Sequence, residues 1–215
     1  GGVQADGEVG GRPVIVAELA GNVMDVDSVM TVDEFISEIN AGVRAVSEIE
    51  GGAAVLARLD NVLLNYSLAA TDRHGGNSLV LGAGEGMLPI DFGRTWYSSE
   101  EDFYRYLTRF GSEGGGYFDL VEAIKNAINA DALSEEQVRE SIESWTFRMR
   151  EAFLLNWDLI AEDATRLHNS GGLSLGTDDL AGFNALMESH KVMLDTRITH
   201  LEEKLDEIVR NLVAA

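Results

Sequence analysis

The 215-residue chain contains no cysteine and only two prolines. The absence of cysteine excludes disulfide bonds, thiolate metal ligands and cysteine nucleophiles together. No run of apolar residues approaches the ~18 that a membrane-spanning helix needs, so we expect no membrane span. Hydrophobic residues nevertheless make up 45% of the chain, which is enough for a packed core.

Basic residues are also scarce. The chain has 16 lysines and arginines against 37 acidic residues, which gives a formal net charge of −21. Only Lys125, Lys191 and Lys204 are lysines. Because such a surface repels phosphate groups, neither nucleic acid nor an anionic membrane surface is an expected partner. The same composition is consistent with adaptation to salt and with a genome that favours arginine codons.

Linear signatures of catalysis and of cofactor binding are missing as well. The run "GAGEG" at 82–86 lacks the Lys-Ser/Thr pair of a phosphate-binding loop. The acidic residues from 25 to 34 do not form an EF-hand, because Met30 and Ile36 stand where that loop needs Gly and Glu. His190 and His200 lie ten residues apart on one predicted helix and make no metal-binding pair. The sequence therefore predicts no catalytic residue, no metal site and no cofactor, and favours a protein that is not an enzyme.

Capping boxes mark two helix starts, Thr31 with Glu34 and Ser134 with Gln137. The first opens a predicted helix whose apolar face runs from Phe35 to Ile49. The two glycines at 51–52 favour a break there, since two adjacent glycines cost about 2 kcal/mol in a helix interior. A second helix is predicted over 53–71.

The regions before and after these helices have no helical pattern. Residues 1–30 are predicted to be a flexible arm, in which "PVIVAEL" is a candidate strand. Residues 72–97 are rich in glycine, and "SLVL" and "MLPIDF" within them are short enough for strands. The remainder, 31–215, is predicted to form one mainly helical domain that carries 72–97 as an insert.

Helical periodicity dominates the second half of the chain. Short helices are predicted over 98–110 and 117–130, and an uninterrupted helix over 135–168. In the long helix the apolar positions Val138, Ile142, Trp145, Met149 and Ala152 keep heptad spacing and then drift to Phe153, Trp157 and Ile160. Such drift suits a helix with more than one neighbour, and Trp145 and Trp157 are favoured as core residues. A stop at 169–172 and a cap at Thr177 predict an antiparallel hairpin with a final helix over 178–213.

The final helix carries a coiled-coil pattern that continues almost to the last residue. Its apolar residues are spaced 4-3-4-3-4, and the stripe is widened beyond what one neighbour covers by Val192, Met193, Val209 and Val213. We expect the stripe to pair first with the helix at 135–168. Its remaining edge is predicted to meet a second copy or a partner subunit. The predicted self-association residues, called the terminal seam below, are Leu194, Ile198, Leu201, Leu205, Ile208, Val209 and Leu212.

The segment "LMESHKVMLDTRITHLEEKLDEIVRNLV" resembles the C-terminal helix of type III secretion filament and needle-tip proteins of the EspA/SseB type. The resemblance implies an exported protein without a cleaved signal peptide, a coiled coil built from helices near both ends, a variable middle and a secretion chaperone as partner. It covers about a sixth of the chain. The helix at 135–168 departs from a simple two-helix subunit and fits a needle-tip layout better.

The sequence thus predicts a mainly α fold, in which a long antiparallel hairpin packs with N-terminal helices and carries a small irregular or β-containing insert. The leading prediction for function is a structural, self-associating subunit of an exported filament or needle tip, secreted or extracellular. A phage or viral structural protein, part of a virion, is the alternative. A small-molecule-binding module or an enzyme without a linear motif ranks third.

Overall fold

The computed structural model is built mainly from helices, as predicted. The helices are α1 (Val32–Asn40), α2 (Gly52–Ser67), α3 (Phe103–Phe110), α4 (Leu120–Asn129), α5 (Glu135–Met149), α6 (Trp157–Asn169), α7 (Leu180–Glu203) and α8 (Leu205–Val213), with a π turn, η5 (Arg150–Leu154), between α5 and α6. The described residues are 8–9, 12–13, 30–44, 51–71, 73–81, 86–89, 95, 102–110, 119–171 and 179–214.

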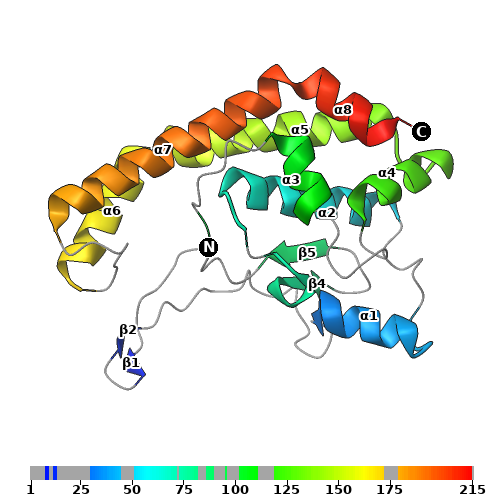
Figure 1. Ribbon diagram of the computed structural model, residues 1–215, viewed down its shortest axis with the longest axis horizontal. Coiled ribbons are helices and arrows are strands. Elements are labelled where there is room, and N and C mark those ends of the chain that lie inside the picture. The colour runs from blue at the N-terminus through cyan, green and yellow to red at the C-terminus, as the bar shows by residue number, and fades with distance from the viewer. Residues whose placement is uncertain are drawn as a thin grey trace.

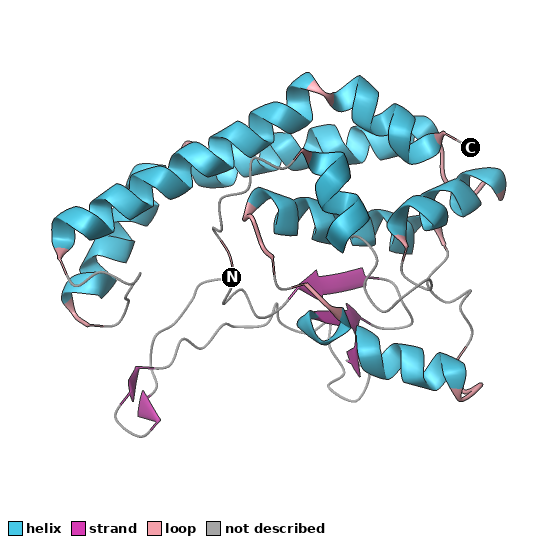
Figure 2. Ribbon diagram, viewed as in Figure 1, coloured by secondary structure: helices cyan, strands magenta, loops and turns pink. Residues whose placement is uncertain are grey.

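A long hairpin lies across a group of shorter helices (Figures 1 and 2). Its first limb is α5, η5 and α6, and its second limb is α7 with α8. The limbs pack against each other along their length, with α6 on α7 and α5 on both α7 and α8. Figure 1 shows α2, α3 and α4 beneath one end of the hairpin, while α6 and the start of α7 project away from them. The predicted antiparallel hairpin is confirmed.

A small antiparallel sheet lies on the far side of α2 from the hairpin (Figure 2). The strand order is β3-β4-β5, and Leu79 of β4 pairs with Leu88 of β5. α2 packs on β5, and α1 packs on β3 and β4. The strands predicted within 72–97 are confirmed at "SLVL" and at the start of "MLPIDF". The bounds are Met30–Thr31 for β3, Ser78–Leu81 for β4 and Gly86–Pro89 for β5, with a separate pair β1 (Glu8–Val9) and β2 (Arg12–Pro13) nearer the N-terminus.

The main core lies where the hairpin crosses α2, α3 and α4. Tyr66 of α2 is at its centre, in edge-to-face contact with Phe103 at 5.2 Å and with Tyr106 at 5.5 Å between ring centroids. The buried guanidinium of Arg197 on α7 lies over the Tyr66 ring and donates to the Tyr66 carbonyl at 2.7 Å. This places a cation at the C-terminus of α2, where the helix dipole favours positive charge. Arg197 therefore fastens the hairpin to the helices beneath it.

Both predicted capping boxes are confirmed. The Thr31 hydroxyl accepts from the Glu34 amide, while the Glu34 carboxylate accepts from the Thr31 amide at 2.7 Å. Ser134 and Gln137 make the same reciprocal pair at the start of α5. Helix starts of this kind depend on residues three apart and not on the rest of the fold, so sequence locates them well.

Two predicted helices end or begin elsewhere than expected. The helix from Thr31 stops at Asn40 and not near Ile49, because Gly42 adopts a positive φ of 72° and turns the chain. Val43, predicted on the apolar face, is 71% exposed. Residues 45–50 lie outside the described part of the chain. α3 begins at Phe103 and is capped by Asp102, whose carboxylate accepts from the Arg105 amide at 2.9 Å.

The two hairpin limbs are each interrupted, contrary to prediction. The π turn at η5 breaks the expected helix over 135–168 just where the apolar pattern drifts, because its wider turn adds one residue to the repeat. In the second limb a break at Lys204 separates α7 from α8. α7 begins at Leu180 with Asp179 as its cap, two residues later than predicted, and Thr177 lies outside the described residues.

Candidate functional site

The terminal seam is buried inside its own chain. Leu194 and Ile198 pack with Trp157, Met149 and Phe183 in the cluster between the hairpin limbs. Leu205 is partly buried against the main core. The prediction that the seam pairs first with the chain's own helices is confirmed by the packing of α7 and α8 on α5. The seam residues fully within the main core are Leu201, Ile208, Val209 and Leu212.

Val209 corrects the prediction of a free flanking edge. Its side chain has no exposed surface, because α8 packs against α3 and α4 as well as α5. The sequence pattern predicted one neighbour within the chain for the terminal helix, whereas in the structure α8 packs on three helices, α3, α4 and α5. At Val209 the edge expected to meet a second copy is therefore covered by residues about 100 positions earlier in the chain, such as Phe103 and Leu107. Val192, on the same predicted edge, is 57% exposed.

Exposed apolar side chains lie instead on the first limb of the hairpin. Phe147 at the end of α5 is 65% exposed, Leu155 just after η5 is 71% exposed, and Leu159 in α6 is 63% exposed. The residues between them that pack inward, Met149 and Trp157, are buried. Phe147, Leu155 and Leu159 thus lie on the solvent side of this limb, and we call these three residues the outer stripe.

The π turn lies at the middle of the outer stripe. The Leu155 amide donates to the Arg150 carbonyl, five residues back, at 3.0 Å, which is the bond that defines the wider turn. The Asn156 side-chain amide donates to the Glu151 carbonyl at 2.7 Å and so satisfies a group that the wide turn leaves free. π turns of this kind are rare in proteins and are frequent at functional sites.

Arg150 holds the π turn on the second limb. Its guanidinium donates to both carboxylate oxygens of Glu202 at 2.7 Å, to Asp195 at 2.9 Å and to the Thr199 hydroxyl at 3.0 Å. The hydrogen bonds to Glu202, and secondarily those to Asp195, raise the pKa of Arg150 above its ordinary value. A bidentate pair of this geometry fixes orientation as well as charge. Arg150 therefore fixes the position of the π turn, and with it the middle of the outer stripe, against α7.

The projecting part of the hairpin has few neighbours. We call residues 150–171 and 179–198 the arm, and the helices α2, α3, α4, α5 and α8 with the sheet the body. α6 packs mainly on α7 and on η5. The arm carries seven acidic and four basic side chains, so its charge is closer to balance than that of the whole chain.

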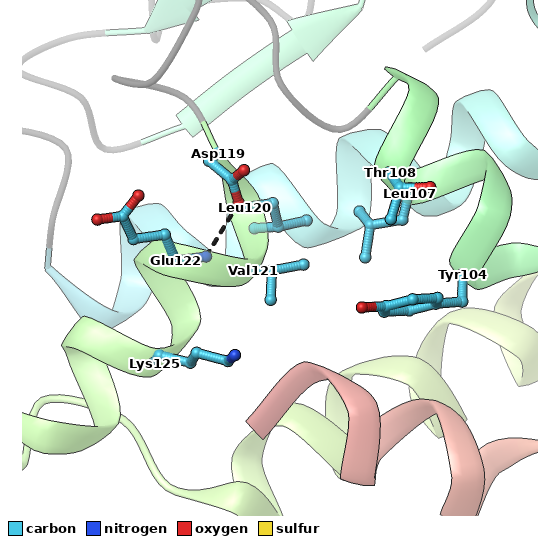
Figure 3. A pocket seen from close by; sticks show the side chains of 8 residues that line it. All are labelled: Tyr104, Leu107, Thr108, Asp119, Leu120, Val121, Glu122 and Lys125. Carbon is cyan, nitrogen blue, oxygen red and sulfur yellow. Dashed lines mark hydrogen bonds between the residues drawn. The ribbon is translucent and has the colours of Figure 1, made fainter. Parts of the chain in front are cut away.

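A shallow groove between α3 and α4 is a second candidate (Figure 3). It encloses about 440 Å³, and its apolar lining includes Leu107, Leu120 and Val121. Figure 3 shows the Tyr104 ring and the Lys125 side chain reaching into it from α3 and α4. A phenol and an ammonium group over an apolar floor are suited to binding a small polar group.

The remaining polar groups of the groove weaken it as a binding site. Asp119 and Glu122 place two carboxylates beside the one ammonium group of Lys125. The Asp119 carboxylate already accepts from the Glu122 amide at 3.0 Å and caps α4. Among the described lining residues, no hydrogen bond joins a base to a nucleophile. The groove therefore lacks the arrangement of a reaction site.

The histidines in the described ranges have structural surroundings. His200 accepts a hydrogen bond on Nε2 from the Phe103 amide at 3.4 Å, at the start of α3. His168 stacks on Phe183 with 4.4 Å between ring centroids. Burial lowers the pKa of His190 below its ordinary value. Within the described ranges, no group of three or more His, Cys, Asp or Glu side chains is placed to hold a metal ion.

Two comparisons with known proteins found no match. No protein-family model matches the chain, and no curated protein matches it significantly. In the part of the chain that the structure describes, no helix combines the length and the apolar character that crossing a bilayer requires.

Sequence reasoning did not identify the outer stripe, and it placed its exposed apolar edge on the other limb of the hairpin. The signal was present, because Leu155 and Leu159 are large apolar residues that fall off the inward pattern of Phe153, Trp157 and Ile160. Their spacing of four residues places them on one helix face. The change of repeat at the π turn obscured this face.

Proposed function

We propose that the chain is a structural, self-associating subunit and that the outer stripe is its self-association surface. One observation carries the proposal: Phe147, Leu155 and Leu159 are each more than 60% exposed and lie along one side of a helical limb that is otherwise well packed. Single exposed apolar residues are ordinary, whereas an aligned group marks an interaction surface. The fixed π turn at its centre supports the same reading.

The setting that we propose is an exported filament or needle-tip assembly, the class that the C-terminal helix resembles. Its support is the hairpin itself, whose second limb includes α7, about 36 Å long at 1.5 Å per residue. Negative-stain electron microscopy separates the settings. Open filaments or tip-like particles support this assembly, whereas closed shells or tail-like rings support the virion alternative.

The mass of the protein in solution tests the proposal. Light scattering over a range of protein concentrations should give a mass that rises from that of one chain to that of at least two. Phe147→Glu and Leu159→Glu should each reduce association at least tenfold, because a carboxylate must then be desolvated at the contact. Both variants should keep the wild-type circular dichroism spectrum, since the original side chains are largely exposed.

A matched control lies on the other limb of the hairpin. Val192 of α7 is 57% exposed but lies outside the outer stripe. Val192→Glu adds the same charge to the same hairpin and should leave association unchanged. A wild-type protein that remains a single chain at every concentration would refute the proposal, and so would Val192→Glu weakening association as much as Phe147→Glu does.

A further inference from the structure

We infer that the outer stripe binds the same stripe of a second copy in antiparallel orientation, about a two-fold axis that passes through the π turn. The inference rests on the proposed function and specifies its partner and register. It rests on the positions of exposed residues along the first limb of the hairpin, several of which lie at equal distances on either side of one central residue.

Two of the three residues of the outer stripe lie symmetrically about Phe153, while Leu155 lies opposite the exposed Glu151 of the second copy. Phe147 and Leu159 each lie six residues from this position, and both are among the most exposed large apolar residues described. Glu140 and Arg166 each lie thirteen residues from it, one on either side, and both are exposed. A two-fold axis at this point brings Phe147 against Leu159 of the second copy and Glu140 against its Arg166.

The four residues share one face of the limb. Glu140 and Phe147 are seven residues apart within α5, and Leu159 and Arg166 are seven apart within α6, so each pair lies about two helical turns apart on one side. From Phe147 to Leu159 there are twelve steps, one more than the roughly eleven that make three α-helical turns. The π turn takes up the extra residue, and the face stays continuous through η5.

Charge selects the antiparallel orientation. In this register the Glu140 carboxylate meets the Arg166 guanidinium twice, once at each end of the contact. The exposed Glu143 and Asp163, ten residues either side of Phe153, meet like charges in both orientations and so do not select between them. In a parallel pair Glu140 would face Glu140 and Arg166 would face Arg166, which places like charges together at both ends. Arg166 now pairs with Asp163 at 2.8 Å, and both side chains are at least 70% exposed, so this local pair is only weakly stabilising.

Symmetry also explains why a second copy is the favoured occupant. A surface that is complementary to itself under a two-fold rotation forms a closed, isologous dimer. A single unrelated partner would need basic and acidic groups at opposite ends and an apolar centre, which is the pattern that the stripe itself presents. The contact joins two hairpins side by side and gives α6 a neighbour in addition to α7 and η5, on which it mainly packs among the described residues of one chain.

A charge exchange tests the register. Glu140→Arg should weaken association about tenfold, because it places two arginines together at both ends, and Arg166→Glu should do the same with two carboxylates. The double variant Glu140→Arg/Arg166→Glu should restore association to within about threefold of wild type, since opposite charges meet again. The three variants and the wild type are compared by sedimentation velocity at one low salt concentration.

A single introduced cysteine locates the axis independently. The chain has no cysteine of its own, so any disulfide must join introduced residues. Ala152 is exposed and one residue from Phe153, so Ala152→Cys should give a covalent dimer on mild oxidation. Ala185→Cys, exposed on α7, is the control and should stay monomeric on a non-reducing gel.

The possible results separate the register from the proposed function. Cross-linking at Ala152→Cys together with rescue by the double variant supports both. A protein that associates in solution but neither cross-links at 152 nor recovers in the double variant overturns the two-fold register while self-association stands. A wild-type chain that stays monomeric at every concentration overturns both, and the stripe then belongs to a different partner.

Discussion

The body and the arm use the same kind of amphipathic helix and reach different degrees of burial. In the body, α8 has α3, α4 and α5 as neighbours, and Val209 has no exposed surface. In the arm, α6 lies mainly on α7, and Leu159 on its other side is 63% exposed. The difference shows that the number of neighbours, and not the apolar pattern of one helix, decides whether a side chain becomes core or surface.

The main core and the cluster between the hairpin limbs differ in size in the same way. Eighteen described residues are buried in the main core, against six in the cluster between the limbs of the arm. Because hydrophobic stabilisation scales with buried apolar area, the body is expected to be the stable unit of the monomer. The arm is then the region whose stability depends most on additional contacts.

The largest expected effect comes from placing a charge in the body. Leu201→Asp and Val209→Asp should each destabilise the protein by more than about 4 kcal/mol, because both side chains are fully buried and the new carboxylate has no partner. Thermal unfolding followed by circular dichroism should show the two variants equally affected. If Val209→Asp melted like the wild type, the packing of α8 on three neighbours would be incorrect.

A smaller effect is expected where the arm is fixed at the π turn. Arg150→Met removes the hydrogen bonds to Glu202 and Asp195 and should lower the free energy of unfolding by about 1 to 2 kcal/mol. Arg150→Lys should recover only part of this, since an ammonium group cannot pair with both oxygens of a carboxylate as a guanidinium does. Denaturant titrations give both values. Full recovery by lysine would mean that charge alone, without geometry, holds the turn.

Salt should stabilise the protein modestly. The net charge of −21 repels itself in the folded state, and screening at 0.1–0.15 M acts over about 8–10 Å. Tm should therefore rise by a few degrees as NaCl increases from low to molar concentration, although ion pairs such as Arg150–Glu202 weaken. A differential scanning calorimetry series that stays flat or falls contradicts this expectation.

The smallest effect concerns the pH dependence of the arm. Burial lowers the pKa of His190 on α7 below its ordinary value of 6.5, so the folded state binds this proton less readily than the unfolded state. Above pH 6.5 His190 is neutral in both states, and its burial does not reduce the free energy of unfolding. As pH falls through the folded pKa the free energy of unfolding decreases, because the unfolded state binds the proton more tightly. His190→Gln should flatten stability between about pH 7 and 5. An unchanged slope would show that other groups set it.

The sequence predicted features whose causes are local. The caps at Thr31 and Ser134 depend on side chains three residues apart, and the break before α2 depends on Gly51. Such contacts form whatever the rest of the chain does. The heptad pattern of the terminal helix likewise predicted an inward face correctly at Leu194 and Leu201.

The features that the sequence failed to predict depend on distant elements. Nothing next to Val209 in the chain indicates that α3 and α4 cover it. The π turn left only a one-residue drift between Met149 and Phe153 as its trace. The outer stripe was missed for the same reason, because Phe147 and Leu159 share a face only once the extra residue of the π turn is included.

Hydrogen exchange at two protein concentrations, about a hundredfold apart, tests most directly whether the arm completes its packing with a second copy. The account predicts that amides of α6 are less protected than those of α2 in dilute protein and slow several-fold at the higher concentration. Amides of α2 should exchange at the same rate in both samples. If α6 is as protected as α2 and its exchange does not depend on concentration, the arm gains no packing contacts from a second copy. That result would contradict the account.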